Sequence, residues 1–272
     1  MTRNRALLIA GPTASGKSAL ALRLAEAFHN RGGAAIVNAD SMQVYRDLRI
    51  LTARPTPADE ARAPHYLYGF RAADAPCSAG EWAQLAAAAI AGICATGRLP
   101  ILVGGAGLYF RALTQGIAPI PDIDPDIRAA ALAAFQAQPA PPLFTGSMLR
   151  FVLSGPRQWL CTRCDARVDA MLAAGALDEV AALESLVRQQ GLSGDLPILR
   201  AVGVPGFRAL LRGEISAGQA ALQAKTETRQ YAKRQLTWIR NQMIAWNRFD
   251  TQDSERIFDE IFSFILKSDL TD

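Results

Sequence analysis

Eight consecutive residues near the start of the chain have the types and spacing of a phosphate-binding loop. They read GPTASGKS and follow the pattern G-x-x-x-x-G-K-S. In such a loop the glycines let backbone N–H groups surround an anion, Lys17 adds a mobile positive charge, and the Ser18 hydroxyl is a ligand for Mg²⁺. The motif predicts a site for a diphosphate or polyphosphate with Mg²⁺, and it does not by itself specify a nucleotide. The predicted binding residues are Gly11, Pro12, Thr13, Ala14, Ser15, Gly16, Lys17 and Ser18.

A carboxylate follows the next apolar segment of the chain. Asp40 comes shortly after the apolar run Ala34–Val37. In a parallel sheet the carboxyl ends of the strands share one edge, so we expect Asp40 to lie beside the phosphate loop. A carboxylate there can hold or deprotonate a nucleophile that faces the phosphate. A helix cap or a ligand of magnesium-bound water would fit the same position.

Strand and helix signals alternate through the first half of the chain. Short apolar runs predict strands at Ala6–Ala10, Ala34–Val37, Pro100–Val103 and Leu149–Leu153. Helical spacing predicts a helix over Ser18–Phe28 and another that begins at a Ser78–Glu81 capping box and continues to about Ala95. This alternation indicates an α/β fold of the P-loop NTPase-like class, in which helices cover both faces of a parallel sheet. From Arg157 onward the pattern is helical, with a long helix over Ser216–Met243.

Composition changes once along the chain. Residues Pro119–Pro142 contain DIDPDI, an Ala-rich stretch and PAPP. We therefore expect three parts: residues 1–118 as the first part of a P-loop core, 119–149 as a reduced insertion region, and 150–272 as the completion of the core with a helical C-terminal part.

The overall composition excludes several classes of protein. Half of the 272 residues are apolar, which suits one large domain with a sizeable core. The net charge of +4 permits an anionic partner without establishing one. No apolar run approaches the roughly 20 residues needed to cross a bilayer, and Ala6–Ala10 is too short for a signal peptide. We expect a cytoplasmic protein with no membrane partner.

Two of the four cysteines, Cys161 and Cys164, form a C-x-x-C pair. A zinc site needs about four ligands, and the two histidines, His29 and His65, lie far away in the sequence. Leu160, Cys164 and Val168 repeat at helical spacing, which favours a packing role for Cys164.

The residues around Asp40 are more specific than the phosphate loop. Asp40–Arg46 reads DSMQVYR, and together with GPTASGKS it resembles the tRNA dimethylallyltransferases, also called tRNA isopentenyltransferases or IPP transferases. Segments similar to this family follow in the family's order over nearly the whole chain except about Ile127–Arg150. They are TARP at Thr52–Pro55, PHYLYGF at Pro64–Phe70, CSAGEWA at Cys77–Ala83, PILVGGAGLYFRAL at Pro100–Leu113, RVDAML at Arg167–Leu172 and TRQYAKRQLTWIR at Thr228–Arg240.

The resemblance implies a reaction. A dimethylallyl group moves from dimethylallyl diphosphate to N6 of the adenosine immediately 3′ of the anticodon, position 37 of tRNA. Asp40 would engage the amine, while Lys17, Arg163 and Mg²⁺ on Ser18 hold the leaving diphosphate. This agrees with the chemistry, because an allylic carbon that gains positive character needs its leaving anion stabilised. The base must also leave its stack to reach a buried carbon.

The resemblance further implies a set of tRNA contacts and a monomeric enzyme with tRNA and dimethylallyl diphosphate as partners. The implied contacts are Asp40, Ser41, Met42, Gln43, Ala106, Arg200, Lys233, Arg234, Gln235 and Arg240.

Basic residues on two predicted helices need separate interpretation. Arg163 and Arg167 are four residues apart and share a helix face. Arg163 is expected at the diphosphate and Arg167 in a structural role, with pairing to Asp165 or Asp169 as the alternative for either. On the last long helix, a stripe is predicted to contact the tRNA backbone, and Trp238 and Trp246 are expected in the core. The stripe consists of Lys225, Arg229, Lys233 and Arg240.

The chain departs from the family pattern in three places. Ala106 stands where the family usually has a threonine, in GGTGLY. The turn Val202–Gly206 lacks the usual tyrosine and basic residue, and the insertion is reduced. Two alternatives therefore stay open: an adenylate (AMP or ADP) isopentenyltransferase, and a degenerate paralogue without turnover. A small-molecule P-loop kinase is disfavoured because the strand ending at Gly104-Gly105 lacks a Walker-B aspartate.

Overall fold

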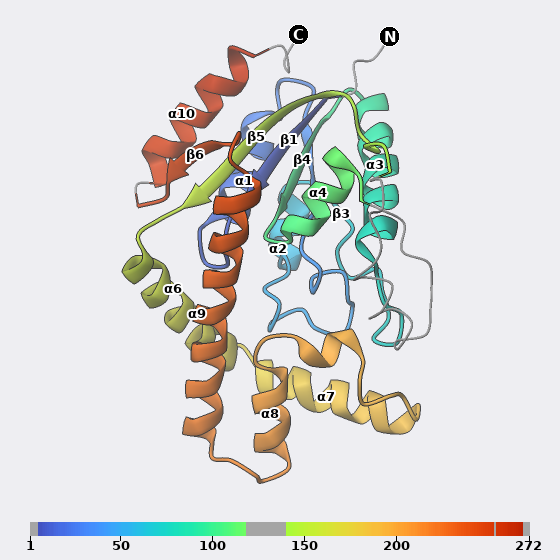
Figure 1. The fold of residues 1–272 in the computed structure, drawn as a ribbon, viewed down its shortest axis with the longest axis vertical. Helices are drawn as coiled ribbons and strands as arrows, with labels where there is room; N and C mark the ends of the chain where they lie inside the picture. The colour runs from blue at the N-terminus through green and yellow to red at the C-terminus, as the bar shows by residue number, and fades with distance from the viewer. Residues whose placement is uncertain (1–4, 118–139, 253, 269–272) are drawn as a thin grey trace, which may run out of the picture.

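The computed structural model describes residues 5–117, 140–252 and 254–268. Their strands form one six-stranded sheet in the order β3-β2-β4-β1-β5-β6, and every neighbouring pair is parallel (Figure 1). The predicted parallel α/β fold is confirmed. The strands are β1 (Arg5–Ala10), β2 (Ala34–Asn38), β3 (His65–Tyr66), β4 (Leu99–Gly104), β5 (Ser147–Ser154) and β6 (Asn247–Asp250).

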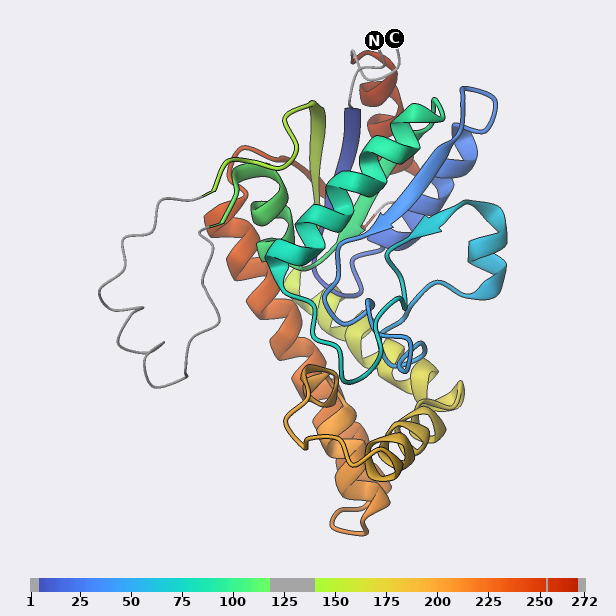
Figure 2. The same cartoon turned by 90° about the vertical axis from the view of Figure 1, so that its right-hand side faces the viewer.

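The helices divide into those that cover the sheet and those that extend beyond it. The first group comprises α1 (Lys17–Ala27), α2 (Pro57–Arg62), α3 (Ala79–Ala95), α4 (Gly107–Gln115) and α10 (Ser254–Leu266). The second comprises α6 (Arg157–Ala173), α7 (Ala176–Gln189), the 3-10 turn η1 (Pro197–Arg200), α8 (Val204–Leu211) and α9 (Ala217–Gln242). Figures 1 and 2 show this second group below the carboxyl ends of the strands, with α9 running from its tip back to the sheet.

Alternating residues of the central strands build two cores. Leu7 and Ile9 of β1 pack with apolar residues of α1 and α10, whereas Leu8 packs on the opposite face with α3 and α4. Successive side chains of a strand point to opposite faces, so a continuous apolar run such as ALLIA is buried from both sides. The helices on both faces that the sequence predicts are therefore present.

The predicted elements match the structure except in detail. β3 and β6 are short edge strands that no sequence signal predicts. Ser78 caps α3 by accepting a hydrogen bond from the Glu81 backbone N–H at 3.1 Å. The expected capping box is only half formed, because the Glu81 carboxylate pairs with Arg71 instead.

The three-part division of the chain stays a prediction. Residues 119–139 of the expected insertion region lie outside the described residues, and the described chain enters β5 at Ser147. Within the described ranges no helix is long and apolar enough to cross a membrane.

A buried tryptophan of α3 supports the end of β2, just before Asp40. Trp82 is fully buried, stacks on Tyr109 with ring centroids 4.4 Å apart, and donates its indole N–H to the Asn38 carbonyl at 2.9 Å. Asn38 is the last residue of β2, two positions before Asp40. α3 thereby fixes the end of the strand that presents Asp40.

Replacing Trp82 with phenylalanine should lower the free energy of unfolding by about 1–3 kcal/mol, because the buried Asn38 carbonyl would lose its partner. Urea denaturation measures this. Trp238→Phe is a matched control, since the buried Trp238 indole N–H has no hydrogen-bond partner among the described residues. An equal loss in both variants would contradict the role given to the Trp82 hydrogen bond.

Candidate functional site

The phosphate loop connects β1 to α1 as the sequence predicts. Gly16 adopts φ +87° at the N-cap of α1, a conformation that favours glycine, and Ala14 has φ +62°. A Cβ on Gly11 would come within 2.7 Å of both the Leu153 carbonyl oxygen and Ser15 Oγ. Ser15 Oγ is buried and has no partner among the described residues. The loop is thus a tight cradle at the N-terminus of a helix, and an anion fits there.

Two arginines of α6 close this cradle. Arg163 Nε donates to the Ala14 carbonyl at 2.8 Å, and Arg167 Nη1 donates to Thr13 Oγ1 at 2.9 Å. Both line a pocket of about 390 Å³ together with Lys17 and Ser18. Arg167 therefore lies in the phosphate-loop pocket beside Arg163, and the structural role expected for it stays a prediction.

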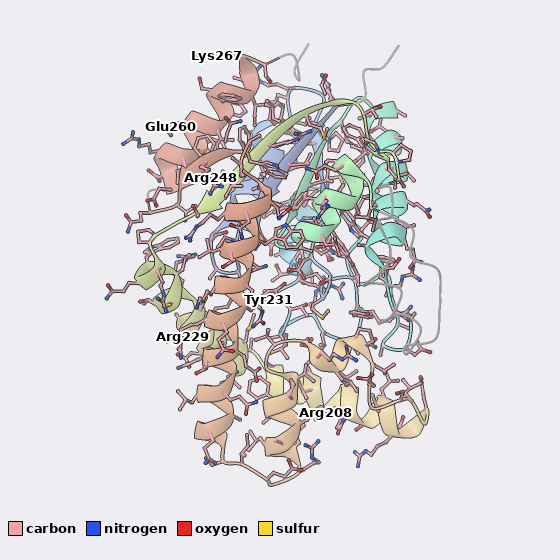
Figure 3. All side chains as sticks on the ribbon, in the orientation of Figure 1. Arg208, Arg229, Tyr231, Arg248, Glu260 and Lys267 are labelled. Atoms are coloured by element: carbon pink, nitrogen blue, oxygen red, sulfur yellow. The ribbon has the colours of Figure 1, made fainter. Side chains whose placement is uncertain are left out.

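Asp165 and Asp169, the alternative partners of these two arginines, form ion pairs with α9 instead. Asp165 bonds Arg229 at 2.5 Å, and Asp169 bonds Lys225 at 2.7 Å, in both cases across the α6–α9 interface. The predicted four-residue basic stripe is therefore wrong for Lys225 and Arg229. Figure 3 shows Arg229 on the side of α9 that faces α6.

The surroundings of Lys17 have opposing effects on the pKa of its ammonium group. Its ammonium group donates to the Pro12 carbonyl at 3.1 Å. Burial and the nearby Arg167 lower the pKa of Lys17 to about 8, and Asp40 opposes this shift. Burial likewise lowers the pKa of Arg167. Two cations held close together in a desolvated pocket are stabilised by an anion between them.

Asp40 is held in place by hydrogen bonds with its sequence neighbours Asn38 and Met42. Its N–H donates to Asn38 Oδ1, and its Oδ1 accepts from the Met42 N–H, both at 2.9 Å. Asn38 Nδ2 donates to the carbonyls of Asp40 and Leu67. Burial is the main cause that raises the pKa of Tyr68 and Tyr231, and the negative charge of Asp40 raises both further. The carboxylate therefore lies near both phenols.

A second cavity begins at Asp40 and has a volume of about 210 Å³. Thr13 and Arg167 are part of its lining, and Arg167 also lines the phosphate-loop pocket. The lining is mostly apolar with a few polar groups, which suits a flat organic group with a polar edge. Its apolar residues include Met42, Leu51, Val168, Met171, Phe207 and Ala224, and its polar residues include Ser41, Arg200, Tyr231 and Arg234.

The remaining predicted contact residues occupy different positions. The Gln43 amide donates to the carbonyls of Thr52 and Ala53, Arg200 pairs with Asp195, and Arg234 lies over the Tyr231 ring at 5.6 Å. Ala106 is the N-cap of α4 and donates its N–H to the Ala39 carbonyl at 3.1 Å.

The last predicted contacts lie on α9. Lys233 and Arg240 are exposed there. Gln235 differs from expectation, because its side chain is buried and its amide bonds Thr13 N and the Gly105 carbonyl.

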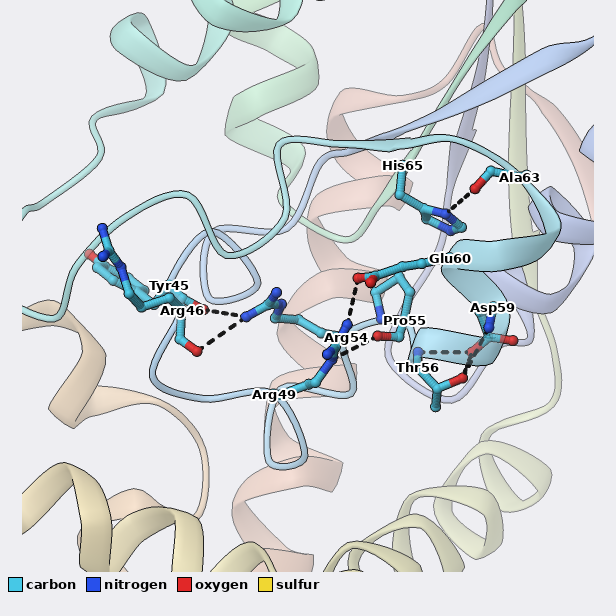
Figure 4. A network of polar contacts seen from close by, with 10 residues as sticks. All are labelled: Tyr45, Arg46, Arg49, Arg54, Pro55, Thr56, Asp59, Glu60, Ala63 and His65. Atoms are coloured by element: carbon cyan, nitrogen blue, oxygen red, sulfur yellow. Dashed lines mark hydrogen bonds and ion pairs between the residues drawn. The ribbon is translucent and has the colours of Figure 1, made fainter.

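A polar network holds the loop that follows Asp40 (Figure 4). Arg54 Nη1 donates to the carbonyls of Tyr45 and Arg46 at 3.2 Å, and Arg49 pairs with Glu60 at 2.6 Å. From the other side, the Glu179 carboxylate of α7 accepts the backbone N–H groups of residues 49–51. Sequence reasoning missed Glu179. Only its position in the first turn of a helix hinted at an exposed carboxylate.

The described residues contain no cluster of three or more histidine, cysteine, aspartate or glutamate side chains that could hold a metal ion. Cys164 is fully buried, which agrees with its predicted packing role. Trp246 is buried against Phe110, whereas Trp238 is half-buried.

Sequence comparisons give a consistent result. A family model described as "IPP transferase" matches residues 43–141 and 130–242. The chain is 47% identical to a tRNA dimethylallyltransferase from Parvibaculum lavamentivorans, with 96% of each chain covered. It is 44% identical to another from Nitrobacter hamburgensis, with 92% of each covered.

Solved structures of similar fold point the same way. A tRNA isopentenylpyrophosphate transferase from Bacillus halodurans is 28% identical, with a TM-score of 0.78 over 97% of this chain and 96% of that one. A tRNA isopentenylpyrophosphate transferase from Staphylococcus epidermidis is 27% identical, with a TM-score of 0.78 over 97% of this chain and 99% of that one.

The lowered pKa of Lys17 predicts how anion affinity depends on pH. A bound anion raises this pKa, so affinity is greatest below pH 8 and falls as the pH rises through the free-state pKa of about 8. Between pH 7 and pH 9 the charged fraction drops from roughly nine-tenths to roughly one-tenth, and we expect about a tenfold loss of affinity for inorganic diphosphate. Calorimetric titration measures it, with Lys17→Met as the control. The same pH dependence in both proteins would contradict the assignment.

Proposed function

Because the chain belongs to the IPP transferase family of tRNA dimethylallyltransferases, we propose that it transfers a dimethylallyl group from dimethylallyl diphosphate to N6 of adenosine 37 in tRNA. One observation carries the proposal: the phosphate-loop pocket and the cavity at Asp40 meet at Arg167. A leaving diphosphate in the first and an amine in the second would face each other across the carbon that is transferred. The relatives are tRNA enzymes, which favours this function over prenylation of free AMP or ADP.

The donor side supplies positive charge where the leaving group gains negative charge. The amine nitrogen attacks C1 of the dimethylallyl group, and the C1–O bond breaks with its electron pair passing to the diphosphate. Lys17, Arg163 and Arg167 surround the place where that charge develops. Preorganised cations in a site shielded from water lower the barrier of such a step.

Mg²⁺ would be held in this pocket by Ser18 together with oxygens of the bound diphosphate. Ser18 presents an exposed hydroxyl at the start of α1, and no acidic cluster competes for the ion within the described residues. Mg²⁺ usually binds through one or two protein oxygens together with phosphate oxygens and water. Bound there, it would neutralise part of the diphosphate charge.

The acceptor side must receive a base that has left its stack. Asp40 lines the cavity, and its second carboxylate oxygen remains available to accept a hydrogen bond from N6. As the new C–N bond forms, one N6 proton leaves toward Asp40. The apolar lining offers stacking surface for the adenine, since a flipped base needs such a pocket.

The rest of the tRNA would contact the exposed side of α9. Lys233 and Arg240 project there without the ion pairs that engage Lys225 and Arg229. Phosphate contacts of this kind position the nucleic acid rather than specify its sequence. We also propose that the protein acts as a monomer in the cytoplasm, the compartment in which an enzyme that acts on tRNA meets its substrate.

Asp40→Asn should lower the turnover of tRNA by roughly 10²- to 10⁴-fold, the usual contribution of a positioned acid or base. The affinity for dimethylallyl diphosphate should not fall by more than about threefold, because the amide keeps the shape and removes, with the proton acceptor, a negative charge that would only repel the anion. Product mass and donor titration measure the two effects. Asp74→Asn, an exposed carboxylate on a nearby loop, is the control. A collapse of donor affinity would instead place Asp40 at the metal, and prenylation of AMP but not tRNA would refute the proposed acceptor.

Lys233→Ala should flatten the log–log salt dependence of tRNA binding by about one unit, as expected when one phosphate contact is lost. Lys225→Ala removes the same side chain from the same helix, but Lys225 is paired with Asp169 and should leave the slope unchanged. Binding measured across a salt series distinguishes them. An unchanged slope for Lys233→Ala would exclude this side of α9 as the tRNA surface.

A further inference from the structure

We propose that Gln235 is a positioning residue whose amide holds the phosphate loop in register with the loop that carries Asp40. The inference rests on the proposed prenyl transfer and adds to it a component that touches neither substrate. Gln235 belongs to α9, the helix that also carries Lys233 and Arg240. Its side chain is only 5% exposed, although lysine and arginine precede it in sequence.

The amide connects two loops that are far apart in the sequence. Gln235 Oε1 accepts the Thr13 N–H at 2.8 Å, and Nε2 donates to the Gly105 carbonyl at 3.2 Å. Thr13 is held from its other side as well, because its hydroxyl accepts from Arg167. The phosphate loop is therefore fixed between α9 and α6 at Thr13, a residue that lines the cavity at Asp40.

The loop at Gly105 is in turn hydrogen-bonded to Ala39, the residue before Asp40. Ala106 follows Gly105 and donates its N–H to the Ala39 carbonyl at 3.1 Å, while the Ala39 N–H donates to the Val103 carbonyl at 2.8 Å. A Cβ on Gly104 would overlap the Ala39 backbone, so these segments are already at closest approach. Gln235 thus ties the diphosphate-binding loop to the neighbour of Asp40 through a short series of hydrogen bonds.

Sterics support the same assignment. Gly105 does not adopt a positive φ, so its backbone conformation does not require glycine. A Cβ there would overlap Gln235 Nε2, and it would also come within 3.1 Å of the Gly11 carbonyl oxygen. The absence of a side chain at position 105 leaves the space that the Gln235 amide occupies.

The polarity of the two bonds allows a sharp test. One end of the side chain must accept and the other must donate, which an amide does and a carboxylate does not. A protonated carboxylic acid, however, also offers one acceptor and one donor. Burial raises the pKa of a carboxyl group, so Gln235→Glu should regain the native bonds as the pH falls.

We therefore expect the activity of Gln235→Glu, divided by that of the wild type at each pH, to rise at least about tenfold between pH 8.5 and pH 6. Gln235→Met has a similar shape and no polar atoms at its end, and its ratio should be low and independent of pH. Gln230→Met, on the exposed side of the same helix, should match the wild type. A pH-independent ratio for Gln235→Glu would overturn the proposal.

Diphosphate titration gives a readout that does not depend on turnover. Gln235→Ala and Gly105→Ala should each weaken the binding of inorganic diphosphate, and the loss in the double variant should be clearly smaller than the sum of the two, because both changes remove the contact between Gln235 and Gly105. Additive losses would overturn the proposal. If the wild type binds diphosphate but prenylates nothing, the proposed function fails while this test of Gln235 still stands.

Discussion

Repulsion between two half-buried cations of the phosphate-loop pocket, Lys17 and Arg167, is the constraint on which the rest of the site depends. Partial burial lowers the pKa of both side chains, the charge of Arg167 lowers the pKa of Lys17 further, and the charge of Arg163 lowers that of Arg167. Asp40 offsets part of this repulsion from the neighbouring strand end. A diphosphate would relieve the remainder, so the site is preorganised for the charge that develops during transfer of an allylic group. Arg163 enlarges this preference from the same helix.

The fold supplies the geometry that holds these charges together. β1 and β2 flank β4 in the sheet, and their carboxyl ends present the phosphate loop and Asp40 to one edge. α6 crosses that edge and delivers its arginines from outside the sheet, while α9 lies against α6 through the Arg229–Asp165 and Lys225–Asp169 pairs. These pairs are partly exposed and add little stability singly. Their effect is to fix the angle at which α6 meets the phosphate loop.

Local patterns predicted the sheet, the loop and the place of Asp40 because each depends on residues close in the sequence, whereas the expectation for Arg163 came from the family resemblance. The assignments that differ depend on contacts between distant segments. Arg167 and Arg163 look alike on a helix, and only their hydrogen bonds to Thr13 and Ala14 show that both reach the loop. The spacing of Lys225 and Arg229 fits a surface stripe, but both pair with aspartates of α6. Gln235 looked like a nucleic-acid contact within a basic segment, although its amide is turned inward. Side-chain direction across a helix interface is not encoded in spacing alone.

Proton uptake on diphosphate binding tests the central claim most directly. If an anion relieves the repulsion between Lys17 and Arg167, binding must raise the pKa of Lys17 from about 8. Calorimetry near pH 8 in buffers of different ionisation enthalpy should then show about half a proton more taken up by the wild type than by Lys17→Met. Equal proton uptake by the two proteins would contradict the account, because Lys17 would then carry the same charge with and without the anion.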